Sequence, residues 1–139
     1  MWGSVKVRSI NIRPRFSETD ALGHINNTAV AVWFEAGRVE YIDDLLAEMH
    51  GGAPSWVMAT QTLDYVAENF FGVDVRVDVA ITKVGRSSFT VVCRMYQNDN
   101  LTVKASSVLV FVDKKTRKSS PLPDDMRALL ESELDPDWL

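Results

Sequence analysis

The segment Arg15–Arg38, with the sequence RFSETDALGHINNTAVAVWFEAGR, decides the fold of this chain. Within eight residues it holds an acid, a glycine, a histidine and two asparagines, namely Asp20, Gly23, His24, Asn26 and Asn27. The apolar run 29–34 follows at once. Asn is a favoured N-cap, and the free backbone N–H groups at a helix start attract negative charge. An acid beside such a helix start indicates acyl-transfer or hydrolytic chemistry.

The sequence predicts a long helix that begins near Asn26 or Asn27. Its first part, 29–34, is apolar on nearly every side, so other parts of the fold must wrap around it. The second half becomes amphipathic, with an apolar face made of Tyr41, Ile42, Leu45, Leu46 and Met49. Gly51, Gly52 and Pro54 are expected to end the helix.

Five further segments read as strands, at 4–12, 56–66, 73–84, 87–96 and 101–112, and the alternation is clearest in VDVRVDVAI at 73–81. Gly85 and Arg86 mark a break or bulge, and Asn-Asp-Asn at 98–100 indicates a hairpin turn. A short terminal helix is predicted over 124–133. Consecutive strands joined in this way form an antiparallel sheet, and an apolar helix needs that sheet to curl around it. The prediction is therefore an α+β fold in which a five-stranded sheet holds one long helix.

Length and composition limit the possible classes of protein. The 139 residues suffice for one domain with a real core, and a hydrophobic share of 46% is ordinary for a globular protein. A net charge of −4 argues against broad binding to nucleic acid or to an anionic membrane. Cys93 is the only cysteine, so no intramolecular disulfide and no cysteine-rich metal site is expected. Without an apolar span or a signal-peptide pattern, the expected location is the cytoplasm.

The quoted segment resembles the 4-hydroxybenzoyl-CoA thioesterase-like branch of the hotdog-fold acyl-CoA thioesterases. That branch typically reads R-(F/Y)-x-(D/E)-x-D-x-x-G-H-(V/I)-N-N, followed by an aromatic-rich helix that ends in E-x-(A/G)-R. The matching positions are Arg15, Phe16, Glu18, Asp20, Gly23, His24, Ile25, Asn26, Asn27, Glu35, Gly37 and Arg38. The stretches VGRSSFT (84–90) and SVLVFVDKKTRKSSPLP (107–123) are similar to the third and the closing strand of the family. The resemblance implies a single hotdog domain over 1–139.

The resemblance also assigns catalytic roles. It implies that Asp20 is the catalytic carboxylate, acting either as general base toward water or as a nucleophile that gives a mixed anhydride. The backbone N–H of Asn27 at the helix start would polarise the thioester carbonyl and stabilise the oxyanion of the tetrahedral intermediate. The alternative interpretation of Asp20 is an ordinary turn-forming residue.

The other motif residues have interpretations of their own. Gly23 would allow the tight turn before the helix, and Asn26 would cap the helix or hold the turn. His24 would either orient Asp20, bind water or touch the thioester, or else serve as a structural residue bonded to the backbone. Glu35 lies three residues before Arg38 on one helix, and we interpret the two as a structural ion pair.

Coenzyme A is part of the implied substrate and carries phosphates, so we expect basic residues to bind these phosphates. Lys83 and Arg86 are the first candidates, and a second basic cluster lies at 114–118. In relatives, hydroxyl residues at the positions of Ser87 and Ser88 approach the active site across a subunit interface, while the alternative is two ordinary strand hydroxyls. The resemblance implies neither a metal nor a separate cofactor.

The leading hypothesis is an acyl-CoA thioesterase that hydrolyses a fatty or aromatic acyl-CoA to the free acid and CoA. The alternatives are a hotdog hydratase or dehydratase and a non-catalytic acyl-CoA-binding protein. The hydratases place four residues between Asp and His, or pair a His with a Glu much further along a helix, whereas Asp20 and His24 have three residues between them. Because hotdog sheets leave edge strands open, we expect a homodimer, or a homotetramer built from two such dimers.

Overall fold

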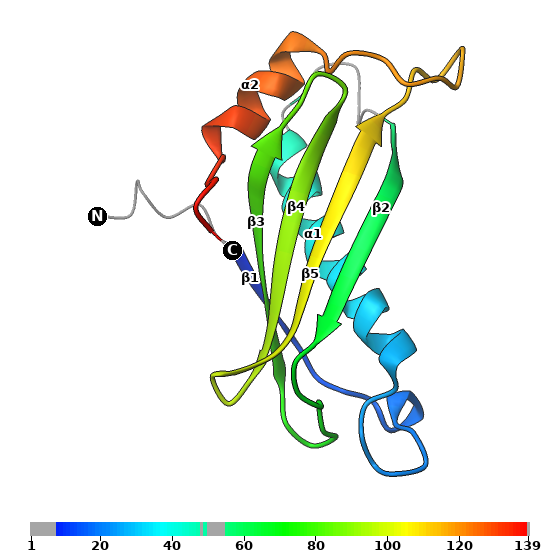
Figure 1. Cartoon of the computed structure of the whole chain (residues 1–139), viewed down its shortest axis with the longest axis vertical. Coiled ribbons are helices and arrows are strands. Elements are labelled where there is room, and N and C mark those ends of the chain that lie inside the picture. The colour runs from blue at the N-terminus through cyan, green and yellow to red at the C-terminus, as the bar shows by residue number, and fades with distance from the viewer. Residues whose placement is uncertain (1–7, 48, 50–54, 139) are drawn as a thin grey trace.

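The computed structural model describes residues 8–47, 49 and 55–138 (Figure 1). Within these residues the helical elements are the 3₁₀ turn η2 (Phe16–Glu18), the long helix α1 (Asn27–Leu46) and the terminal helix α2 (Asp124–Ser132). The strands are β1 (Arg8–Ile12), β2 (Trp56–Tyr65), β3 (Val75–Val84), β4 (Ser88–Gln97) and β5 (Asn100–Phe111). Helix α1 ends at Leu46, so the predicted end at 51–54 was too late and Met49 lies beyond the helix. Residues 51–54 and the expected strand residues 4–7 lie outside the described residues. No helix in the described ranges is both long and apolar enough to cross a membrane.

The five strands form one antiparallel sheet with the order β1-β3-β4-β5-β2, so β1 and β2 are its edges (Figure 1). The β4–β5 hairpin turns at Asn98 and Asp99, which have φ angles of 50° and 63°. Asn and Asp tolerate this left-handed conformation better than most residues do, which is why a two-residue hairpin forms there. The predicted α+β fold with a five-stranded antiparallel sheet is confirmed.

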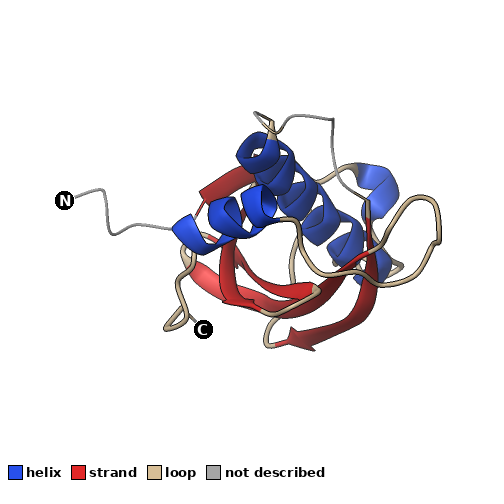
Figure 2. Cartoon of the chain, turned by 90° about the horizontal axis from the view of Figure 1, so that it is seen from above, coloured by secondary structure: helices blue, strands red, loops and turns tan. Residues whose placement is uncertain are grey.

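Helix α1 lies in the concave side of the curved sheet (Figure 2). Phe34 and Ile42 are fully buried in the layer between them, against strand residues such as Val77. Gly37 marks the closest approach, because a Cβ atom there would lie 3.1 Å from a methyl carbon of Val77 and 3.2 Å from one of Val79. The missing side chain lets the helix approach β3 closely.

The sheet wraps only one side of α1. Val32 and Val39 remain 58% and 46% exposed, although the apolar run led us to expect a helix enclosed all round. The reason is geometric, because a five-stranded sheet curls far enough to cover one face of a helix and then ends at β1 and β2. The stripe of α1 that holds Val32 and Val39 is thus left open by the described residues.

Helix α2 and the C-terminal tail close the end of the fold that carries the β3–β4 turn (Figure 1). Met126 and Leu130 are fully buried, and Leu134 forms a parallel bridge with Ile81. The guanidinium of Arg127 donates hydrogen bonds to the carbonyls of residues 85 and 86, at 2.7 and 2.9 Å. These bonds satisfy backbone groups of the turn and hold it in place.

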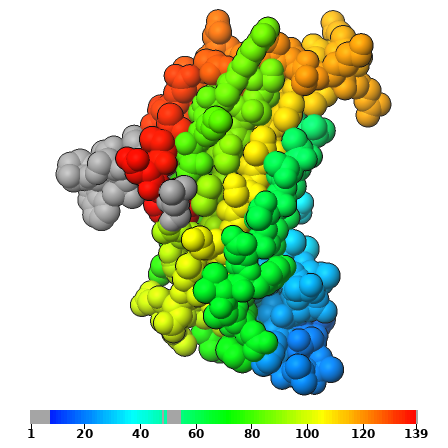
Figure 3. Space-filling view, in the orientation of Figure 1, coloured from blue at the N-terminus to red at the C-terminus, as the bar shows by residue number. Residues whose placement is uncertain are grey.

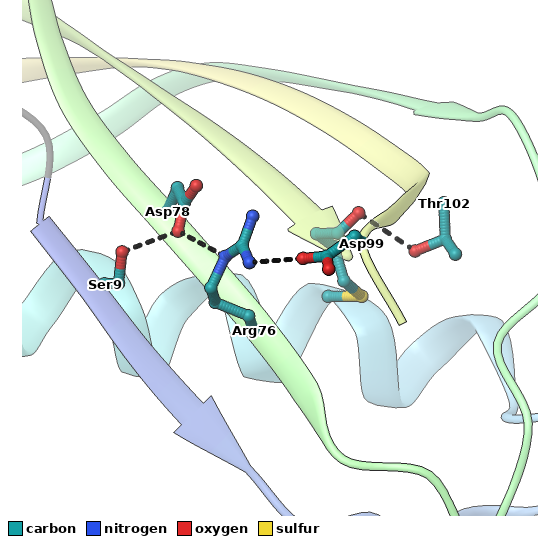
Figure 4. A network of polar contacts seen from close by, with 6 residues as sticks. Ser9, Arg76, Asp78, Asp99 and Thr102 are labelled. Carbon is teal, nitrogen blue, oxygen red and sulfur yellow. Dashed lines mark hydrogen bonds and ion pairs between the residues drawn. The ribbon is translucent and has the colours of Figure 1, made fainter. Parts of the chain in front are cut away.

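A polar network on the outer face of the sheet ties the edge strand β1 to its neighbours (Figure 4). Ser9 donates to Asp78 Oδ1 at 2.6 Å, and Arg76 contacts Asp78 and Asp99 at 3.1 Å each. Because these groups are partly exposed, each ion pair stabilises the fold only modestly. The network helps to set the register of β1 against β3.

We predict that Gly37→Val lowers the free energy of unfolding by about 1–3 kcal/mol, because the new side chain would overlap Val77 and Val79. Helix propensity alone would favour Val over Gly, so the loss would report overpacking. Chemical denaturation monitored by circular dichroism measures the change. Ala36→Val is the matched control on the exposed side of the same helix. Equal stability of wild type and Gly37→Val would contradict the close approach.

Candidate functional site

The loop before α1 is a small hairpin. Thr19 pairs with Ile25 in an antiparallel bridge, and the backbone N–H of Asp20 donates to the carbonyl of His24 at 2.8 Å. Gly23 has a φ of +80°, a conformation that side chains with a Cβ rarely adopt. Gly23 therefore forms the tight turn that the sequence predicted. The turn brings Asp20 and His24 side by side.

One of the two carboxylate oxygens of Asp20 is hydrogen-bonded within this turn. Its Oδ1 accepts hydrogen bonds from the backbone N–H groups of Leu22, at 2.8 Å, and His24, at 3.1 Å. No described residue hydrogen-bonds to Oδ2, and the side chain is exposed. The turn-forming interpretation of Asp20 and the catalytic one are thus compatible, because one oxygen anchors the carboxylate while the other remains open to a substrate.

Glu18 anchors the hairpin to the helix. Its Oε1 accepts from the backbone N–H of Arg15 at 2.7 Å, and its Oε2 accepts from Nε1 of the buried Trp33 at 2.8 Å. Its carbonyl accepts from the N–H of Asn26 at 2.7 Å. Sequence reasoning named Glu18 only as a motif position, since nothing in the sequence showed that Trp33 would be its partner.

The helix start has a side-chain cap and a free donor. Asn26 is the N-cap, and its Oδ1 accepts from the backbone N–H of Thr28 at 3.0 Å, as the sequence predicted. The N–H of Asn27 points to no acceptor among the described residues. The carbonyl of Asn27 accepts from Tyr65 Oη at 3.3 Å, which links the helix start to the end of β2. The free N–H is the group that an oxyanion would use.

These elements surround a cavity of about 440 Å³. Its walls come from the hairpin, from the first turn of α1 and from the segment that follows β2: Asp20, His24, Ile25, Asn26, Asn27, Val30, Tyr65, Val66, Ala67, Glu68 and Asn69. In Figure 3 the blue segment that contains the hairpin adjoins the green segment that contains residues 66–71, at one end of the molecule. The structure thus brings together Asp20, His24, Asn26 and Asn27, with Gly23 in the turn between them.

His24 has a partner that the sequence did not reveal. Its Nδ1 lies 3.0 Å from Oε1 of Glu68. Its ring packs edge to face on Phe70, with 5.1 Å between ring centroids, and the two residues also form a backbone bridge. Glu68 stands far from the motif in sequence, so only folding brings it to the cavity.

The other predicted substrate-binding residues surround the β3–β4 turn, at the opposite end of the sheet: Lys83, Arg86, Ser87 and Ser88. Through β5, Ser88 is aligned with Val57 near the start of β2, whereas Tyr65 at the end of β2 lines the cavity. The two ends of β2 are about 30 Å apart at about 3.3 Å per residue. One chain therefore does not bring these four residues to Asp20, and the basic loop at 114–118 follows β5 at the same far end (Figure 1).

The predicted ion pair between Glu35 and Arg38 does not form. Arg38 is buried and donates to Gln61 Oε1 at 3.4 Å, while Glu35 is exposed on the outer face of α1. Arg38 lies on the face of α1 that packs against the sheet, so its side chain reaches Gln61 on β2 and not Glu35. Cys93 packs in the core, and burial raises the pKa of its thiol to about 12. In the described ranges, no three His, Cys, Asp or Glu side chains are grouped so as to hold a metal ion.

Comparison with known proteins identifies the family to which this chain belongs. A family model described as the thioesterase-like superfamily matches residues 14–130, and the chain belongs to this superfamily. The resemblance to hotdog thioesterases that the motif suggested is thereby confirmed.

Individual relatives agree with this class. The uncharacterized protein YsmA of Bacillus subtilis is 31% identical over 84% of this chain and 80% of its own length. A predicted thioesterase from Bacillus stearothermophilus is 37% identical, with a TM-score of 0.84 over 92% of this chain and 96% of its own. A thioesterase from Thermus thermophilus, solved with coenzyme A and Zn, is 28% identical, with a TM-score of 0.76 over 88% of this chain and 95% of its own.

We predict that Glu18→Gln destabilises the protein by about 1–3 kcal/mol, because an amide offers one acceptor oxygen where two are needed. Either the Arg15 N–H or the Trp33 Nε1–H then loses its acceptor. Urea denaturation measures the effect. The matched control is Glu35→Gln, which makes the same chemical change at an exposed position of α1. If both variants unfold at the same urea concentration as wild type, Glu18 is not the anchor of the hairpin.

Proposed function

We propose that this protein is an acyl-CoA thioesterase that hydrolyses a fatty or aromatic acyl-CoA to the free acid and CoA. The observation that carries the proposal is one cavity in which the open carboxylate oxygen of Asp20 and the free N–H of Asn27 occur together. Membership of the thioesterase-like superfamily and the coenzyme A bound to the Thermus thermophilus relative support this assignment.

The two groups can act on one thioester. With its carbonyl oxygen at the N–H of Asn27, the acyl carbon is open to attack, and the negative charge that develops on the oxygen strengthens this hydrogen bond. If Asp20 is the base, its Oδ2 takes a proton from a water whose oxygen bonds to the acyl carbon, and collapse breaks the C–S bond and expels the CoA thiolate. If Asp20 is the nucleophile, its Oδ2 bonds to the acyl carbon, the thiolate leaves, and water hydrolyses the resulting anhydride.

A second copy of the chain would complete the site. The edge strand β2 carries exposed apolar side chains, with Val57 at 54% and the adjoining Val66 at 60% exposure. Antiparallel pairing of two β2 strands around a two-fold axis would place the β3–β4 turn of the partner near the cavity. The serines 87 and 88 and the basic residues 83 and 86 would then reach the substrate from across the interface, and the exposed stripe of α1 would be covered.

The catalytic proposal predicts that Asp20→Asn lowers kcat by roughly a hundredfold to ten-thousandfold. The amide oxygen still accepts from the N–H groups of Leu22 and His24, so the turn and the fold should persist. A panel of aromatic and fatty acyl-CoA substrates with detection of the free thiol measures the rate, and circular dichroism checks the fold. Glu35→Gln, which removes an exposed carboxylate of α1, should keep the rate of wild type.

The outcomes separate function from mechanism. A wild-type protein that hydrolyses no acyl-CoA of the panel would rule out the proposed function. Full activity of Asp20→Asn would leave the function standing but remove the assigned role of this carboxylate.

The assembly predicts a dimer in solution. Light scattering coupled to size-exclusion chromatography should give at least twice the mass of one chain at micromolar concentration. Val57→Lys should dissociate the dimer and reduce activity, because a charged side chain would be buried against the partner. Val57→Thr, which keeps the β-branched shape without a charge, is the control and should remain dimeric. A monomeric wild type that is fully active would contradict the shared site.

A further inference from the structure

His24 is held in one orientation from several sides. Its backbone N–H and carbonyl both bond to Asp20, and its backbone pairs with Phe70 in a bridge. The ring stacks edge to face on Phe70, and its side chain is only 25% exposed. A ring fixed in this way presents its two nitrogen atoms in defined directions, and one of them, Nδ1, faces the carboxylate of Glu68 at 3.0 Å.

The position of Glu68 is fixed by the backbone as well. The next residue, Asn69, is buried, and its carbonyl accepts from the N–H of Ile25 at 2.8 Å, one residue after His24. The two chain segments therefore run side by side at this point. The side chain of Glu68 is 61% exposed, but this pairing places its backbone beside the hairpin that carries His24.

The carboxylate of Glu68 lies at ion-pair distance from Nδ1, and its charge favours one of the two tautomers of a neutral His24. An ionised carboxylate only accepts hydrogen bonds, so it favours the tautomer with the proton on Nδ1. The other nitrogen, Nε2, is then left with a lone pair, and no described residue bonds to it. The ring itself lines the cavity, together with Asp20 and Asn27.

We propose that Glu68 is a positioning residue, which holds His24 with Nδ1–H on its carboxylate and thereby keeps Nε2 as an acceptor for the hydrolytic water. This inference rests on the proposed thioesterase function and deepens it. When Asp20 is the base, one proton of the water goes to Asp20 Oδ2, and the second stays on the attacking oxygen, hydrogen-bonded to Nε2.

The same tautomer serves the other route. When Asp20 has formed the anhydride, its carboxylate is acylated and cannot act as a base. Nε2 of His24 then takes a proton from water as the water oxygen bonds to the acyl carbon of the anhydride. Collapse of the tetrahedral intermediate breaks the bond from that carbon to Oδ2 of Asp20, which releases the acid and restores the carboxylate, and the imidazolium passes its proton to solvent. In the opposite tautomer Nε2 carries a hydrogen and presents a donor to the water, which opposes attack in both routes.

The direct test is the tautomer of His24, which nitrogen-15 NMR of the imidazole reports. The chain has only two histidines, so a His50→Gln variant identifies the signals of His24. At a pH where the ring is neutral, wild type should show the proton on Nδ1. Glu68→Gln, whose amide can donate as well as accept, should shift the population toward a proton on Nε2.

The kinetic test uses the same variant. Glu68→Gln should lower kcat roughly 10- to 100-fold, the size of effect found for partners that orient metal-bound histidines, with little change in KM. The control is Asp74→Asn, which removes an equally exposed carboxylate, 64% exposed, from an ion pair with Arg13. It makes the same change in net charge and should stay within about twofold of wild type. In a His24→Gln background, Glu68→Gln should add no further loss.

Several results would overturn the inference. One is a wild-type His24 with its proton on Nε2, and another is an unchanged tautomer and kcat in Glu68→Gln. A third is an equal loss of kcat from Glu68→Gln when His24 is already replaced. The NMR measurement needs no substrate, so it separates this inference from the thioesterase proposal. If the protein has no thioesterase activity, the proposed catalytic role of Glu68 is ruled out, whichever tautomer His24 adopts.

Discussion

Helix α1 carries apolar side chains around most of its circumference, and the fold must keep them from water. The sheet curves to cover one side and comes so close that a Cβ atom at position 37 would lie 3.1 Å from a methyl carbon of Val77. The other side, with Val32 and Val39, stays open in one chain. The curvature of the sheet, the exposed stripe and the proposed dimer all follow from the burial of this one helix. The cavity exists because the start of the same helix emerges at the end of the sheet.

At that helix start, the turn and the proposed catalysis use the same carboxylate through different oxygen atoms. One oxygen of Asp20 accepts hydrogen bonds from two backbone N–H groups. These bonds restrict rotation of the carboxylate and leave its second oxygen in a defined place. Glu18 ties the hairpin to Trp33 on the helix, so the carboxylate and the N–H of Asn27 belong to one rigid unit. Such preorganisation is what a site needs if it is to stabilise charge that appears only during the reaction.

Local features were predictable from the sequence, while distant contacts were not. Alternation at 73–81 indicated a strand, Asn98 and Asp99 indicated the hairpin, and Asn26 was identified as an N-cap, because each depends on neighbouring residues. The pairing of Glu35 with Arg38 was wrong, because spacing on a helix does not say which side chain the core will draw inward. Glu68 was missed because no local pattern connects it to His24.

The sequence by itself determined the elements, the turn and the group of Asp20, Gly23, His24, Asn26 and Asn27, since eight consecutive residues can only meet in one place. The tertiary structure alone decided what joins that group and what does not. It brought Glu68 to His24 because the segment after β2 pairs with the hairpin, and it put Ser88 at the far end because β2 runs the full length of the sheet. Both outcomes depend on which distant segments pair with one another, and the hydrophobic periodicity within one segment does not identify its partner.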